Sequence, residues 1–185
     1  MSRLLDRARE IAEEVLFPAS LAVDAAPRVP ATQLDLLAAE GFYGMAGPAG
    51  PDFTTACRIV EELASGCLTT TFVFQQHHGT VRAVATSSTP GLAGAWLEPL
   101  CRGQSRAGTV QAALRPGPPS VRARGVDGGY LFDGAAPWVS GWGMVDVLHT
   151  AGRDEQDTLH WALLDARPGP TLSVDPVRLV AANAS

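Results

Sequence analysis

The apolar residues of the first hundred positions recur at intervals of three and four, which is the spacing of an amphipathic α-helix. In the first helix these positions share one face and are Leu4, Leu5, Ala8, Ile11, Ala12, Val15 and Leu16. Proline lacks a backbone donor and disfavours a helix interior, so Pro18 is expected to end this run. A second helix is expected between Pro30, which suits a helix start, and Gly41, which suits the position after a helix end.

Three further helices are predicted in this part of the chain. One begins near Asp52, whose carboxylate suits the N-cap position. The next covers the stretch from Leu68 to about Ala85, in which Arg82 is the one charged residue, and it is expected to be buried on most sides. The last is opened by Pro90 and closed by Gly103. The pattern therefore predicts a bundle of five helices.

After residue 103 the period of the apolar residues changes to two, as in β-strands. An Asp-Gly-Gly turn at residues 127–129 predicts a hairpin between two of these strands. The strands are expected at residues 107–116, 121–126, 130–133, 144–151, 158–164 and 171–180. We therefore expect an α+β protein, with a helical bundle in residues 1–103 followed by a small β-barrel or sandwich in residues 104–185.

Residues 134–153 contain an alternation of aromatic and small polar side chains that bears on function. Trp138, Ser140 and Trp142 occupy every second position, so on a strand their side chains would share one face. A face with a small hydroxyl between two flat aromatics is either an ordinary half-buried strand or a platform for a flat ligand. The residues alone leave both interpretations open.

Composition limits the partners of the chain. It has 46% hydrophobic and 18% charged residues, which indicates a globular protein. The net charge is -5, so no nucleic-acid or membrane partner is expected. The uncharged run that includes residues 67–81 is too polar to span a bilayer, because it contains four consecutive polar side chains at residues 75–78. Three cysteines without Cys-x-x-Cys spacing, and a charged start in place of an export segment, predict reduced thiols in a cytoplasmic protein.

Few residues suit metal, hydrolytic or Rossmann-type chemistry. The adjacent histidines His77 and His78 diverge by about 100° on a helix, so a structural role is expected for them and no metal site is predicted. No Gly-x-Ser-x-Gly elbow surrounds Ser87 or Ser88, which gives a serine nucleophile little support. The chain also lacks a Gly-x-Gly-x-x-Gly motif, so a Rossmann nucleotide site is not expected.

The order of the elements resembles a known family. The predicted helices end in AWLEPLCRGQ at residues 95–104, and the β unit then contains Gly-x-x-x-Trp-Val-Ser at residues 134–140. The sequence LVAANAS at residues 179–185 resembles the segment before the strand that leads into that family's third, helical domain. Together these features resemble the first two domains of the acyl-CoA dehydrogenase family of flavoproteins, over nearly the whole chain. The resemblance implies FAD as cofactor and an acyl thioester or another small molecule as substrate.

The resemblance also implies roles for individual residues. Trp138 would lie against the isoalloxazine ring of FAD, and Ser140 would donate its hydroxyl near N5 and O4 of that ring. Gln111, Ala112 and Ala113 stand where the family presents backbone and hydroxyl groups to the pyrimidine edge of the flavin. Fixed donors at such places stabilise the negative charge that develops on the ring when it accepts a hydride.

Two features depart from the family pattern. The sequence Arg-Pro-Gly-Pro-Pro at residues 115–119 replaces a Thr-Glu-Pro-x-x-Gly-Ser-Asp loop, so altered contacts to acyl-CoA and to the FAD pyrophosphate are expected. The family's third domain, a four-helix unit that supplies the catalytic glutamate and most of the oligomer interface, is absent from residues 1–185. We therefore expect the catalytic base to lie outside this chain, and the chain to work in a homo- or hetero-oligomer.

Three functions are compatible with these features. The leading one is FAD-dependent dehydrogenation of an acyl thioester, in which a base removes the α-proton and the flavin takes the β-hydride. The second is a flavin-dependent monooxygenase on the same scaffold, which the altered loop at residues 115–119 keeps open. The third is a non-catalytic partner subunit of a split or heteromeric relative. In each case the chain alone is expected to bind FAD weakly or not at all, because the family's site is closed by the third domain.

Overall fold

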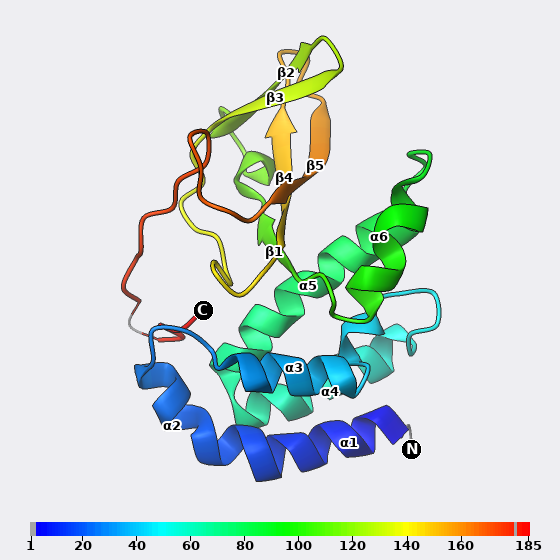
Figure 1. The fold of residues 1–185 in the computed structure, drawn as a ribbon, viewed down its shortest axis with the longest axis vertical. Coiled ribbons are helices and arrows are strands. Elements are labelled where there is room, and N and C mark those ends of the chain that lie inside the picture. The colour runs from blue at the N-terminus through cyan, green and yellow to red at the C-terminus, as the bar shows by residue number, and fades with distance from the viewer. Residues whose placement is uncertain (1–2, 180) are drawn as a thin grey trace.

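The structure is a computed structural model in which residues 3–179 and 181–185 are described, and it consists of a helical half and a sheet half (Figure 1). The helices are α1 (Arg3–Ile11), α2 (Phe17–Ala25), α3 (Ala31–Ala39), α4 (Phe53–Gly66), α5 (Leu68–Thr86) and α6 (Leu92–Cys101). The strands are β1 (Ala107–Val110), β2 (Val121–Val126), β3 (Gly129–Gly134), β4 (Val147–Arg153) and β5 (Leu159–Asp165). All of these helices precede β1, which confirms the predicted α+β class.

The first helix does not end at Pro18, contrary to the prediction. A π-helical segment, Ala12–Leu16, joins α1 to α2, and α2 continues to Ala25. Pro18 stands in the first turn of α2, where a helix needs no backbone donor. In the π turn each backbone N–H bonds to the carbonyl five residues earlier instead of four. This change of partners just before Pro18 lets the chain continue as a helix instead of breaking.

The other helices begin at the predicted signals. At the start of α4 the Asp52 carboxylate accepts a hydrogen bond of 3.0 Å from the Thr55 backbone N–H, which confirms the N-cap. Helix α3 lies between Pro30 and Gly41, as expected. The buried residues of α5 recur along its whole length, in agreement with the nearly uncharged sequence that predicted a buried helix. Local signals therefore set most of the helical half.

The β half, predicted as a small barrel or sandwich, is one five-stranded mixed sheet. Its central strand is β4, which pairs antiparallel with β5 and in parallel with β1, where Ala107 lies opposite Val147. Strands β2 and β3 form the predicted hairpin around residues 127–129, and β2 joins β4 through one parallel pair, Arg122 with Arg153. The pairing of β1 with β4 joins segments far apart in the sequence, so no local period reveals it.

Two segments predicted to contain strands are irregular. Residues 135–146 form a loop and a turn, and residues 173–179 have no regular structure. In the second segment Pro176 lacks the backbone donor that a strand ladder uses. The last residue of that predicted strand, Val180, lies outside the described residues. These two segments are therefore loops and do not add strands to the sheet.

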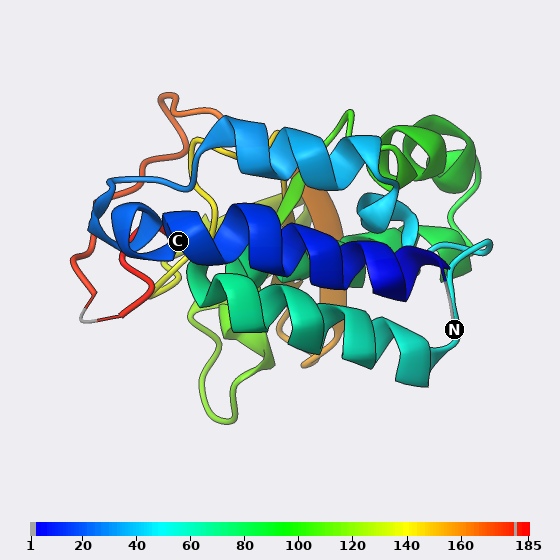
Figure 2. The same ribbon diagram turned by 90° about the horizontal axis from the view of Figure 1, so that it is seen from below.

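The helices form a layer beneath the sheet. Figure 2 shows α1 between α3 and α4, with the sheet behind this layer. Helix α1 packs on α4, and α5 packs on both α4 and β1, around a core that includes Leu63 and Phe74. The C-terminal end returns to this core, because Ala184 is buried in it and its carbonyl accepts a 3.2 Å hydrogen bond from the Val29 N–H. None of the helices in the described part of the chain combines the length and apolar character that a membrane crossing requires.

Candidate functional site

The start of β1 is fixed to the helical half by a buried histidine. His77 of α5 accepts a hydrogen bond from the Ala107 N–H at Nδ1 and donates from Nε2 to the Leu100 carbonyl, both at 3.1 Å. Because a carbonyl only accepts, Nε2 carries the proton and Nδ1 is free to accept. Burial lowers the pKa of His77 to about 3, which keeps the ring neutral and suited to both bonds. His77 thus has a structural role, and it sets where β1 leaves the helices.

The end of β1 presents polar groups next to α5. The Thr109 hydroxyl of β1 donates a 2.6 Å hydrogen bond to Gln76 Oε1 of α5. The strand stops at Val110, and a 3₁₀ turn, Ala112–Leu114, follows in place of the strand predicted to residue 116. Gln111 is exposed at the start of that turn, so its amide is available at the edge of the sheet.

The loop after β3 brings Ser140 to β1. Gly108 allows this approach, because a Cβ at that position would lie 2.8 Å from the Ser140 carbonyl oxygen. Gly141 follows with a φ of +82°, a conformation that residues with a side chain rarely adopt, and it turns the chain. Ser140 therefore reaches the end of β1 from a turn rather than from a strand.

The alternation of Trp138, Ser140 and Trp142 is not the face of a strand, so that prediction was wrong. Trp138 is 66% exposed, whereas Trp142 is partly buried and packs in the cluster of Val110 and Leu148. The glycine turn after Ser140 separates the surroundings of the two tryptophans. Trp138 and Ser140 stay together, and Trp142 belongs to the core of the sheet half.

A pocket of 230 Å³ lies where these segments meet. It is lined by residues of α5, of β1 and the turn after it, and of the loop after β3, namely Phe72, Gln76, Thr109, Gln111, Ala112, Arg115, Pro137, Trp138 and Ser140. Four of the five residues predicted to contact the flavin are in this lining. The fifth, Ala113, is not, because its side chain is buried with Val121 and Ala151 in the core of the sheet half.

Sequence reasoning missed the other five lining residues. Phe72 and Gln76 belong to α5, Thr109 to β1, and Arg115 and Pro137 to the loops. A signal existed for Gln76, since a polar side chain on a helix expected to be buried needs a partner or a ligand. Thr109 and Phe72 carried no comparable signal, because their place in the pocket depends on the packing of α5 against β1.

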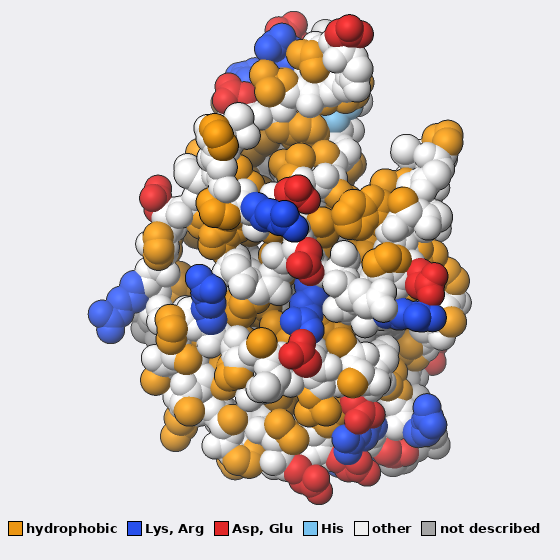
Figure 3. All heavy atoms as spheres, in the orientation of Figure 1, with side chains coloured by type: hydrophobic (Ala, Val, Ile, Leu, Met, Phe, Trp, Pro, Cys, Tyr) orange, Lys and Arg blue, Asp and Glu red, His pale blue; other side chains and the backbone are white. Residues whose placement is uncertain are grey.

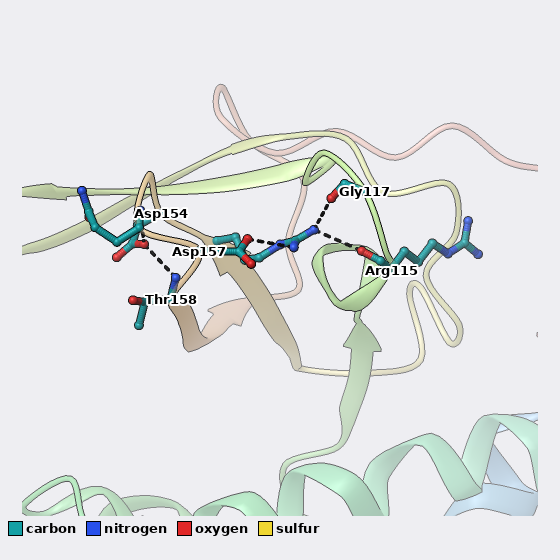
Figure 4. A network of polar contacts seen from close by, with 7 residues as sticks. Arg115, Gly117, Asp154, Asp157 and Thr158 are labelled. Carbon is teal, nitrogen blue, oxygen red and sulfur yellow. Dashed lines mark hydrogen bonds and ion pairs between the residues drawn. The ribbon is translucent and has the colours of Figure 1, made fainter.

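Among the described residues that line the pocket, Arg115 alone is charged. Its guanidinium lies over the Trp138 ring, 5.0 Å from the ring centroid. Arg153 of β4 holds the backbone of this loop, because it donates to the carbonyls of Arg115 (3.1 Å) and Gly117 (2.6 Å) while it pairs with Asp157 (2.8 Å). Figure 4 shows this network, with the Arg115 side chain running away from it on the other side of the loop.

A larger pocket of 610 Å³ lies in the helical half, between residues 41–51 and α6. Its lining includes none of the predicted site residues. Size alone does not identify a functional site, and the smaller pocket joins an exposed aromatic face to several hydrogen-bonding side chains. We therefore treat the smaller pocket as the candidate site. The described residues contain no group of three or more His, Cys, Asp or Glu side chains that could hold a metal ion.

Comparison with known protein sequences gives a family match and a curated relative. The family model described as Acyl-CoA dehydrogenase, N-terminal domain, matches residues 2–104, more than half of the chain. Among curated proteins, 3-sulfinopropanoyl-CoA desulfinase from Variovorax paradoxus is 27% identical over 155 residues. That alignment covers 76% of this chain and 38% of the desulfinase, so the chain spans well under half the length of this relative.

Solved structures share the fold over the whole chain. A glutaryl-CoA dehydrogenase from Mycobacterium smegmatis in complex with FADH2 matches with a TM-score of 0.84 at 15% identity. A glutaryl-coenzyme A dehydrogenase in complex with glutaryl-CoA matches with a TM-score of 0.85 at 18% identity. Both cover 100% of this chain, which spans 51% and 52% of those proteins. The shared fold and the family match over residues 2–104 lead to one conclusion: this chain belongs to the acyl-CoA dehydrogenase family.

Proposed function

We propose that this chain forms the helical and β parts of an FAD-dependent oxidoreductase that acts on an acyl thioester. The observation that carries the proposal is the pocket in which Gln111, Ala112, Trp138 and Ser140 meet, although they come from two separate segments. These are residues for which the family resemblance implies flavin contacts. The relatives support the same assignment, since one solved structure holds FADH2 and another holds glutaryl-CoA.

The pocket residues suit one edge of a flat ring that carries carbonyl and N–H groups. Trp138, at 66% exposure, offers a flat apolar face. The Ser140 hydroxyl and the Gln111 amide offer donors and acceptors, and neither has a hydrogen-bond partner within residues 3–179 and 181–185. A volume of 230 Å³ holds part of an FAD molecule, so the pocket fits the ring edge rather than the whole cofactor.

The chain's own residues would bind and orient a ligand in this pocket. When bound, FAD supplies an acceptor for a hydride. The Trp138 indole excludes water from one face of the pocket, and the Ser140 hydroxyl donates to an acceptor where negative charge develops. None of the described lining residues is a carboxylate or a histidine, so this pocket provides binding and orientation but not the base that removes the α-proton.

The proposal is tested by titrating the chain with FAD while following the indole N–H signals of its four tryptophans by NMR. We expect weak binding, because a partly enclosed site leaves most of the cofactor in water. The Trp138 signal, assigned with a Trp138→Phe variant, should move most. The Ser140→Ala variant should weaken binding by roughly two- to tenfold, the effect of one neutral hydrogen bond. Movement of the Trp96 or Trp161 signal without that of Trp138 would place the flavin elsewhere and overturn the proposal.

The Ser88→Ala variant is the matched control. Ser88 is an exposed serine between α5 and α6 and does not line the pocket, so its loss should leave the FAD affinity unchanged. If Ser140→Ala and Ser88→Ala titrate alike, Ser140 is not a flavin contact.

A flavin-dependent monooxygenase is the second candidate function. The observation that favours it is the Arg-Pro-Gly-Pro-Pro loop at residues 115–119, which stands at the pocket in place of the family's usual loop. In an assembly that includes the catalytic base, anaerobic bleaching of the flavin by an acyl-CoA indicates a dehydrogenase. A flavin that is bound but not bleached favours the monooxygenase, and a chain that never binds flavin favours a non-catalytic partner subunit.

The proposal includes an oligomer, homomeric or with a helical partner. Several large apolar side chains of the helical half are exposed, among them Leu21 at 86%, Phe53 at 82% and Phe17 at 65%. Apolar surface of this kind is typical of interfaces. Sedimentation velocity should show self-association that grows with concentration, and a single monomeric species at high concentration contradicts this part of the proposal.

A further inference from the structure

We propose that Arg115 is an anion-binding residue of the pocket, whose guanidinium binds a phosphate or carboxylate group of the molecule that lies against Trp138. The identity of the pocket as a ligand site rests on the function proposed above. Three observations carry the assignment: the charge of the lining, the geometry of Arg115 on Trp138, and the clamp on the loop that holds Arg115.

The lining of the pocket carries one full charge. Its described residues include no Asp or Glu that could neutralise Arg115, and its other polar side chains are amides and hydroxyls. The whole chain has a net charge of -5, so this cation reverses the overall sign locally. A pocket with this charge favours a ligand that presents an anionic group.

The contact of Arg115 with the Trp138 ring leaves the N–H groups of the guanidinium without a hydrogen-bond partner among the described residues. The Arg115 Cζ atom lies over the indole, 5.0 Å from the ring centroid. A cation–π contact with an indole face occupies none of the lone-pair acceptors that guanidinium N–H groups bind, so it leaves their hydrogen-bonding capacity unused. Within the ranges 3–179 and 181–185 the Arg115 side chain has no hydrogen bond or ion pair. Its planar fork therefore remains available for two oxygens of a phosphate or carboxylate.

The loop that carries Arg115 is held in place from outside the pocket. Arg153, whose side chain is 13% exposed, donates to the carbonyls of Arg115 and Gly117. Arg115 has a φ of -69° and a ψ of 145°, the extended conformation that a residue before proline adopts. Pro116 and Pro118 restrict the loop further. A loop fixed in this way loses less conformational entropy when Arg115 binds an anion.

The two sources of such an anion are the phosphate of a flavin nucleotide and an acid group of the substrate. Two pairs of probes separate them. Riboflavin and FMN share the flavin ring, and FMN adds a phosphate. Glutaramide and glutarate share a carbon chain, and glutarate carries the charge. Each is titrated against the whole chain by NMR, with the Trp138 indole signal as the readout.

In at least one pair the anionic member should bind roughly tenfold more tightly than its uncharged counterpart. That preference should disappear in Arg115→Gln and persist in Arg124→Gln, a matched control at an exposed arginine of β2. A preference for FMN identifies the nucleotide phosphate, and a preference for glutarate identifies a substrate carboxylate. Far-UV circular dichroism should be unchanged in both variants, because both side chains are exposed.

Two results overturn the assignment: an equal preference in the wild type and in Arg115→Gln, or no preference for either anion in the wild type. Failure of the proposed flavin function has a different signature. In that case riboflavin leaves the Trp138 signal unmoved, while the comparison of glutarate with glutaramide still reports on Arg115.

Discussion

The helical core around Thr70 and His77 and the pocket edge of the sheet half differ in how their polar side chains are bonded. In the helical half, Thr70 donates a buried 2.6 Å hydrogen bond to Gln33, and His77 bonds to backbone groups through both ring nitrogens. At the edge of the sheet half, Gln111 and Ser140 face the pocket without a partner among the described residues. Bonded polar groups such as those of Thr70 and His77 stabilise the helical core, whereas the unpartnered groups of Gln111 and Ser140 are what the proposed ligand site requires.

Among the described residues the fully buried aromatic rings lie in the helical half, although that half also exposes Phe17, Leu21 and Phe53. Phe42 and Phe74 of the helical half are fully buried, whereas in the sheet half Trp138, Tyr130 and Trp161 are 66%, 53% and 45% exposed. Figure 3 shows hydrophobic side chains at the surface in the region between the sheet and α6. Because buried apolar area supplies most of the folding free energy, the helical half should dominate the stability of the chain.

The largest effect is expected from a pair of phenylalanines, one in each half. Phe74→Ala removes a ring that is 1% exposed and should lower the free energy of unfolding by about 3–5 kcal/mol. Phe132→Ala removes a half-buried ring that lies against Gly152, and about half of that loss is expected. Urea unfolding followed by circular dichroism measures both. Equal losses of unfolding free energy in the two variants would contradict the expectation that the helical half dominates the stability of the chain.

Acid should weaken the helical half through His77. Burial lowers its pKa from 6.5 to about 3, so between these values the unfolded chain binds a proton that the folded chain excludes. The stabilisation is therefore complete above pH 6.5 and is lost as the pH falls toward 3. A change from about pH 7.5 to about pH 5 should cost about 2 kcal/mol at this residue.

The measurement is the urea midpoint at the two pH values for the wild type and for His77→Gln. The variant should be less stable at both, and its stability should depend less on pH. Burial also lowers the pKa of His78 and of His149, so part of the pH dependence should remain in the variant. Identical pH dependence in the two proteins contradicts a buried neutral His77.

A smaller effect is expected at the loop beside the pocket. Arg153→Met removes the hydrogen bonds to the Arg115 and Gly117 carbonyls and should cost about 1 kcal/mol. It should also broaden the Trp138 indole signal in the NMR spectrum, because Arg115 loses its fixed place. Arg102→Met is the control, since its ion pair with Glu98 is exposed and should contribute less than about 0.5 kcal/mol. A sharp, unshifted Trp138 signal in Arg153→Met would show that the clamp does not position Arg115.

The smallest effect on stability is expected at Ser140. A hydroxyl kept for a ligand contributes little to folding, so Ser140→Ala should change the free energy of unfolding by less than about 0.5 kcal/mol. Thermal unfolding of Ser140→Ala and of the wild type without ligand measures this change in stability. The FAD titration described above measures the effect of the same variant on binding. A loss above about 1 kcal/mol would show that Ser140 is a packing residue, and the contrast between the halves would lose its clearest example.

The sequence predicts those parts of the fold that depend on neighbours along the chain. The N-cap at Asp52, the helix after Pro30 and the hairpin at residues 127–129 are local features, and all three are present. The predictions at Pro18 and at Trp142 were wrong for a shared reason. A π turn and a glycine turn changed the local geometry there, and apolar periodicity does not contain either one.

The candidate site was predictable only in part. Trp138, Ser140, Gln111 and Ala112 came from the family resemblance rather than from the period of the sequence, and the structure places all four at one pocket. The sequence singled out Arg115 only as part of residues 115–119, which differ from the loop that the family usually has. Its position depends on Trp138 and on an arginine of β4, two contacts between segments that no local pattern connects.

The parallel pairing of β1 with β4 is expected to delay the formation of the pocket during folding. In the sequence the whole β2–β3 hairpin lies between β1 and β4. The chain must therefore close a long loop before the pairing of β1 with β4 contributes to stability. Helices and hairpins form from nearby residues and do so sooner. We therefore expect Thr109 and Ser140 to come together only after this slower pairing is made. A newly made chain should therefore become helical before the proposed ligand pocket exists.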